Sequence, residues 1–100
     1  MNWEIGRMSN FYPAENIPDA ANKLDKLEPG WANKIDLITL DLDTCTNCVL
    51  AQISGMHYVK AMRHYFGVSE DEDFFYENEI FGGNADLNEW TKEIQSRLGK

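Results

Sequence analysis

Basic residues and long apolar runs are both scarce in this chain. Nine Lys and Arg residues face seventeen Asp and Glu residues, which gives a formal net charge of −8 at pH 7. Proteins bind phosphate backbones through clustered Lys and Arg, so this balance argues against nucleic acid or an anionic membrane as a ligand. No apolar run is long enough to span a bilayer. We therefore expect a protein partner and neither nucleic acid nor a membrane.

Cysteines and catalytic motifs are also scarce. The chain has two cysteines, and its first residues lack the basic and hydrophobic regions of a secretory signal. This pattern is typical of a reducing cytosol, so we expect a cytoplasmic protein. No Ser/His/Asp order, glycine-rich phosphate loop or nucleotide fingerprint occurs. The sequence therefore predicts no enzyme, no catalytic residue and no required cofactor.

The hydrophobic content is sufficient for one small domain. Of the 100 residues, 43% are hydrophobic and 12% aromatic. Residues 1–17 mix aromatic side chains with Gly, Ser, Asn and Pro, which predicts an irregular N-terminal arm. Residues 18–100 predict a single compact, mainly α-helical domain with at most a short strand.

Local start and stop patterns place a first helix. Pro18 suits a first helical turn, and Pro29-Gly30 would end the helix after about Glu28. Within it, Leu24 and Leu27 are the predicted core contacts. Residues 31–34 then predict one short helical turn with Trp31 as a core anchor.

Two more helices follow from capping patterns near the C-terminus. Ser69 and Glu72 have capping-box spacing, which predicts a short helix through residues 74–76. Asp86 repeats the cap before a last helix that Gly99 would end. The predicted core stripe of that last helix comprises Leu87, Trp90, Ile94 and Leu98.

The middle of the chain holds the longest helical pattern. Residues 35–43 alternate imperfectly and predict a short strand or extended segment. Residues 44–66 predict one central helix that is apolar nearly all round in its first half. Gly55 lies inside this pattern, where it would mark either a close backbone approach or a kink.

The most specific chemical motif is Cys45-Thr46-Asn47-Cys48. At a helix start it has the form of a redox dithiol, and the same spacing is half of a zinc site. The histidines are His57 and His64, and on an unbroken helix His57 would lie roughly 18 Å from Cys45. One metal cannot bridge that distance. The favoured interpretation is a buried Cys48 and a partly exposed Cys45, with metal and redox use as open alternatives.

Acidic residues give the second candidate site. Asp36, Asp41 and Asp43 lack the spacing of a calcium loop and are assigned to a solvent face and a helix cap. Between Arg63 and Lys92, by contrast, there is no Lys or Arg at all. The acids of this interval that we assign to partner binding are Glu70, Asp71, Glu72, Asp73, Glu77 and Glu79.

Two other interpretations of this acidic interval stay open. It could be a solvated segment that keeps the protein soluble. It could also pair internally with a mildly basic stripe on the preceding helix, in which case each surface pair would contribute little. That stripe comprises His57, Lys60, Arg63 and His64.

Two segments carry a resemblance to other proteins. Residues 29–52 contain Gly30-Trp31, Ile35-Asp36-Leu37, Leu40-Asp41-Leu42 and Cys45-x-x-Cys48-Val49-Leu50-Ala51-Gln52, and a weaker match is Leu87-x-x-Trp90-x-x-Glu93-Ile94. This pattern resembles a group of small proteins, encoded by bacteriophages and by actinobacterial genomes or prophages, that has no established activity. Ala51 stands where that group usually has glycine. The resemblance implies a phage or prophage origin and residence in a bacterial cytosol.

Together these features favour an interaction protein without catalysis. One concrete form is an inhibitor that blocks the nucleic-acid-binding surface of a host defence protein, as anti-CRISPR proteins do. Two alternatives belong to other classes. One is a small metal- or thiol-dependent domain that uses Cys45 and Cys48, and the other is a structural accessory of the virion.

Overall fold

The computed structural model describes residues 14–69 and 72–99, and this part of the chain is helical without strands. Its elements are α1 (Ile17–Leu27), η1 (Trp31–Lys34), α2 (Val49–Ser54), α3 (Tyr58–Phe66), α4 (Glu72–Glu77) and α5 (Leu87–Arg97). The mainly α-helical prediction is confirmed. The predicted arm lies outside the described residues up to position 13, whereas Ala14 and Ile17 are buried in the core. No helix within the described ranges is long and apolar enough to cross a membrane.

Helix α1 forms where its start and stop residues predict it. The Asn16 side chain accepts a hydrogen bond from the Asp19 N–H, which caps the first turn. Gly30 adopts a positive φ of 80° after the helix ends. The predicted contact at Leu24 is confirmed, but Leu27 is 45% exposed and is not a core residue. The buried face comprises Ile17, Ala20, Ala21 and Leu24.

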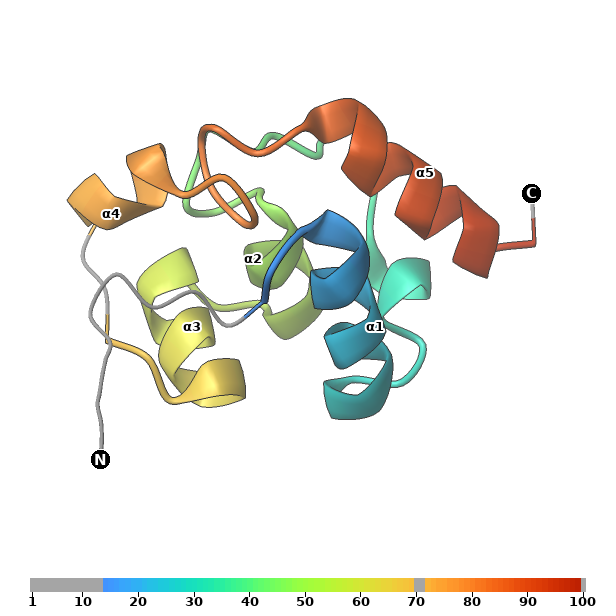
Figure 1. The fold of residues 1–100 in the computed structure, drawn as a ribbon, viewed down its shortest axis with the longest axis horizontal. Coiled ribbons are helices and arrows are strands. Elements are labelled where there is room, and N and C mark those ends of the chain that lie inside the picture. Colours follow the sequence, from blue (N-terminus) through green and yellow to red (C-terminus); the bar gives the residue numbers. More distant parts are fainter. Residues whose placement is uncertain (1–13, 70–71, 100) are drawn as a thin grey trace.

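Helix α5 packs on α1 and on η1 (Figure 1). Asp86 caps it as predicted, since its carboxylate accepts hydrogen bonds from the N–H groups of Asn88 and Glu89. Of the predicted core stripe, Trp90 and Ile94 are fully buried and Leu98 is partly buried. Leu87 is 47% exposed, so the stripe begins one turn later than predicted.

The predicted continuous helix over residues 44–66 is wrong. Helix α2 begins only at Val49, and it ends at Gly55, which adopts a left-handed φ of 73°. The Ser54 hydroxyl donates to the Leu50 carbonyl oxygen and accepts from the Met56 N–H, which completes the break. The chain then turns, and α3 begins at Tyr58. A glycine at this position allows the left-handed turn that other residues adopt only with strain.

The short strand predicted for residues 35–43 is also wrong. Asp36 accepts a hydrogen bond from the Ile38 N–H, and Asp41 accepts one from the Asp43 N–H, each at 2.9 Å. Aspartates that bond to the backbone two residues ahead stabilise turns instead of strands. Gln52 of α2 holds this turn segment in place, because its amide accepts from the Asp36 N–H and donates to the Asp36 carbonyl oxygen.

We predict that Gly55→Ala lowers the free energy of unfolding by about 1 kcal/mol, because alanine is strained at positive φ. Open space surrounds the position a Cβ would occupy, so steric overlap does not contribute. Gly55→Asn is the matched control, since asparagine tolerates this conformation better. Urea unfolding of the three proteins tests this. Equal stability of wild type and Gly55→Ala would contradict it.

Candidate functional site

Helix α4 is attached to the molecule through one buried ring. Phe75 is fully buried and packs on Tyr58 with 4.6 Å between ring centroids. The Phe75 carbonyl oxygen accepts hydrogen bonds from the N–H groups of Asn78 and Gly83. A Cβ at Gly82 would collide with this carbonyl oxygen, so glycine is required there. These contacts fix the orientation of α4.

Asn78 holds the turn that follows α4. It is the buried polar residue of the described core, with 1% exposure. Its side-chain oxygen accepts from the N–H groups of Ile80 and Phe81, each at 2.8 Å, and its amide donates to the Tyr58 hydroxyl at 3.3 Å. Both ends of the amide are therefore engaged, as a buried polar group requires. Nothing in the sequence pattern distinguishes this asparagine from the other asparagines of the chain.

The opposite side of α4 faces solvent. Figure 1 shows α4 at one end of the molecule, away from the C-terminal end of α5. Asp73 and Glu77 on α4, and Glu79 just after it, are exposed, and their assignment to partner binding stays a prediction. Two aromatic side chains accompany them, Phe74 at 59% exposure and Tyr76 at 51%. Of the other assigned acids, Glu70, Asp71 and the side chain of Glu72 lie outside the described residues.

A pocket of about 280 Å³ beside this surface is rich in carboxylates. Glu79 contributes to it from the turn after α4, and Glu15 contributes from the segment before α1. The sequence analysis missed the pocket, because these segments are 64 positions apart and meet only in the folded chain. Its lining residues are Glu15, Asn16, Ile17, Glu79, Ile80, Asn84, Asp86 and Glu89.

The Cys45–Cys48 motif lies in a turn before α2 and not on a helix. Cys48 is fully buried as predicted, whereas the predicted partial exposure of Cys45 is wrong, because Cys45 is buried at 8% exposure. Neither cysteine forms a disulfide. Burial raises the pKa of the Cys48 thiol to about 11. A redox dithiol needs one thiol with a lowered pKa, and Cys48 does not have the pKa of such an attacking thiol.

The distance argument against a shared metal is wrong, because it assumed an unbroken helix. The break at Gly55 brings the start of α3 back to the motif, and the Tyr58 N–H donates to the Cys45 carbonyl oxygen at 2.9 Å. His57, one residue earlier, accepts a hydrogen bond from the Val59 N–H through Nδ1 and so caps α3. Within residues 14–69 and 72–99, no group of three or more His, Cys, Asp or Glu side chains could hold a metal ion.

The basic stripe remains on α3, where Lys60, Arg63 and His64 are exposed. Its predicted pairing with the acidic interval stays a prediction, because Glu70 and Asp71 lie outside the described ranges. The predicted acids at 36, 41 and 43 are exposed, and two of them close the turns described above.

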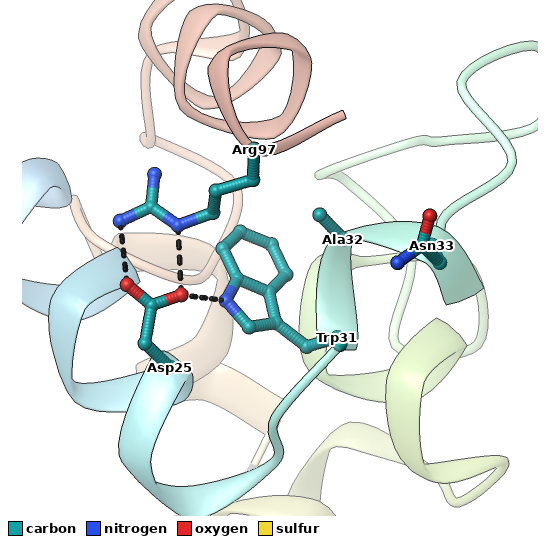
Figure 2. Close-up of a pocket in the computed structure, with 6 residues that line it drawn as sticks. Asp25, Trp31, Ala32, Asn33 and Arg97 are labelled. Carbon is teal, nitrogen blue, oxygen red and sulfur yellow. Dashed lines mark hydrogen bonds and ion pairs between the residues drawn. The ribbon is translucent and has the colours of Figure 1, made fainter. Parts of the chain in front are cut away.

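A second pocket, of about 220 Å³, lies between α1, η1 and α5. Figure 2 shows the Arg97 guanidinium beside Asp25, with hydrogen bonds of 2.8 and 3.0 Å, while the Trp31 Nε1–H donates to the same carboxylate at 2.9 Å. Arg97 also donates to Asn22 and Glu93. Trp31 and Arg97 thus both bond to Asp25, and this cluster of side chains joins α1, η1 and α5.

No protein-family model, curated protein or solved structure matches the chain.

We predict that native Cys48 resists alkylation by iodoacetamide at pH 8, because a pKa of about 11 leaves roughly one thiol in a thousand ionised. Urea-unfolded protein, in which the pKa returns to its ordinary range, is the control and should react readily. Mass spectrometry of digested samples measures each thiol. Rapid labelling of Cys48 in the native protein would reverse this assignment and favour a thiol-dependent activity.

We predict that Arg97→Lys lowers stability by roughly 1 kcal/mol at pH 7, because lysine cannot form the two parallel hydrogen bonds to Asp25. The Arg97 hydrogen bond lowers the pKa of Asp25 below its ordinary value. This contribution is therefore present above about pH 4 and disappears as the pH falls below it.

Denaturant unfolding at pH 7 and at pH 3 measures this difference. Lys92→Arg, an exposed change on the same helix, is the control and should be neutral at both values. A stability difference between wild type and Arg97→Lys that persists unchanged at pH 3 would rule out the Asp25 carboxylate as its source.

Proposed function

We propose that this protein is a non-catalytic interaction module that binds a basic surface of another protein. The observation that carries the proposal is the acidic end of the molecule. Asp73 and Glu77 are exposed on α4. Glu79, which follows the helix and is also exposed, lines the acidic pocket. Side chains from distant parts of the chain thus add negative charge to one region, in a protein whose formal net charge is −8.

Charge of one sign in one region has a defined effect on association. It steers an oppositely charged partner toward the surface and raises the association rate, most strongly at low ionic strength. The same charge repels nucleic acid and anionic membranes. The acidic end therefore selects proteins with exposed Lys and Arg as partners.

The concrete form that we favour is inhibition of a nucleic-acid-binding defence protein of a bacterial host. Such a protein carries a basic surface that binds phosphates, and carboxylates fixed on a small domain can occupy it. The resemblance of residues 29–52 to phage and prophage proteins supports this choice of partner.

We predict that the triple variant Asp73→Lys, Glu77→Lys, Glu79→Lys loses its partner from bacterial lysate, with capture reduced at least tenfold. The altered side chains are exposed, so the fold should be retained, and circular dichroism checks this. Wild-type capture should also weaken between about 0.1 M and 0.5 M salt, as screening predicts.

The matched control is Asp73→Glu, Glu77→Asp, Glu79→Asp, which changes the same three positions and keeps the charge. It should capture the partner as the wild type does. Quantitative mass spectrometry of the captured proteins compares the three baits. Capture that is insensitive both to salt and to charge reversal would refute the proposed function.

A further inference from the structure

The exposed face of α4 combines negative charge with aromatic rings. Phe74 and Tyr76 are the exposed aromatic residues of the described chain, at 59% and 51%, and both belong to this one six-residue helix. The other large exposed apolar side chains lie on three separate segments. Those are Leu27, Ile38 and Leu87.

Helical geometry defines where the charges and rings point. Successive residues are rotated by 100° about a helix axis, and the buried Phe75 marks the inward direction. Phe74 and Tyr76 therefore project from opposite flanks of α4. Asp73 and Glu77 project between them, on the side away from the core. The exposed face is thus a ridge of carboxylates with one aromatic ring on each flank.

This ridge is held in a fixed orientation before any partner binds. Phe75 packs against Tyr58 with the ring planes tilted by 59°, and this contact anchors the inward side of the helix. Asn78 and the Phe75 carbonyl fix its C-terminal end through the hydrogen bonds described above. A binding surface that is already ordered loses less conformational entropy on association.

A complementary partner surface would be a groove with a basic floor and apolar or aromatic walls. Proteins bind single-stranded nucleic acid with this combination, in which a positive groove follows the phosphates and aromatic side chains stack on the bases. A duplex-binding surface contacts phosphates on a stacked helix and needs no such aromatic walls. Charge complementarity and the flanking rings therefore select the first kind of groove.

We infer that α4 occupies the single-strand-binding groove of a nucleic-acid-binding protein, with Asp73 and Glu77 at phosphate positions and Phe74 and Tyr76 at base positions. This inference rests on the proposed function and names the partner surface. The carboxylates accelerate association, and the rings slow dissociation, because interface mutations act chiefly on dissociation.

The first test separates the rings from the charges. Using the partner captured by the wild-type protein, Phe74→Ala and Tyr76→Ala should each weaken binding about tenfold or more. Tyr76→Phe keeps the ring and should bind within about twofold of wild type, as should the exposed apolar controls Leu27→Ala and Ile38→Ala. Surface plasmon resonance measures the rates, and thermal melting confirms that each variant is folded.

The second test is competition. An oligothymidylate should displace the protein from its partner at a concentration at least tenfold lower than a duplex of equal charge. If the charge-reversed variant fails to bind but both alanine variants bind normally, or if duplex competes equally well, this inference falls and the proposed function stands.

Two further outcomes also count against the inference. If no captured partner depends on the acids, the proposed function falls with it. If light scattering shows a wild-type dimer that Phe74→Ala and Tyr76→Ala convert to monomer, a second copy of this chain covers the ridge and the inference is wrong.

Discussion

The buried ring of Tyr58 connects three segments on which the acidic end of the molecule depends. The Tyr58 backbone N–H donates a hydrogen bond to the Cys45 carbonyl oxygen, and the Tyr58 ring packs on Phe75. The Tyr58 hydroxyl accepts a hydrogen bond from the Asn78 side-chain amide. This position exists because α2 stops at Gly55 and the chain turns before α3. Without that turn, the cysteine-containing segment, α3 and α4 would lack a common contact. The orientation of the acidic ridge is therefore set by a residue that is buried in the core.

A row of aromatic rings extends this support through the molecule. The ring centroids of Phe66 and Phe81 lie 5.5 Å apart, and those of Phe81 and Trp90 also lie 5.5 Å apart. The centroids of Trp90 and Trp31 are separated by 5.9 Å. The Trp90 Nε1–H also donates to the Ile80 carbonyl oxygen at 2.6 Å. Buried aromatic pairs add to stability beyond the area they bury. The row joins α3 to the C-terminal helix and η1, so a small domain gains a continuous core from few residues.

The parts of the fold that were predictable from sequence depend on local chemistry. Asn16 and Asp86 bond to the first turns of their own helices, so their roles follow from the neighbouring residues. Gly55 was visible as a break or a close approach, but its φ depends on the path to Tyr58. The aspartates at 36 and 41 were assigned to a strand because the alternation of apolar and acidic residues can be seen in the sequence alone. A strand also needs a neighbouring strand to hydrogen-bond with, and that neighbour is set by the tertiary fold.

The candidate site likewise has features that can be predicted from the sequence and features that cannot. The charge of Asp73, Glu77 and Glu79 is visible in the sequence, since no Lys or Arg interrupts that interval. The exposure of Phe74 and Tyr76 cannot be predicted from the sequence, because three consecutive aromatic residues do not reveal which one is buried. Only the contact of Phe75 with Tyr58 decides it.

The burial of Phe75 against Tyr58 also explains how a helix as short as α4 can be stable enough to present a surface. An isolated helix of six residues is not stable in water, because its first turn orders several residues for a single hydrogen bond. Tertiary contacts must therefore supply the stability of α4, and they do so through Phe75 and the turn at Asn78. The anchor uses the inward side, while Asp73, Phe74, Tyr76 and Glu77 stay exposed. Under the proposed function, the carboxylates and aromatic rings exposed at those positions share one role, which is contact with a partner protein.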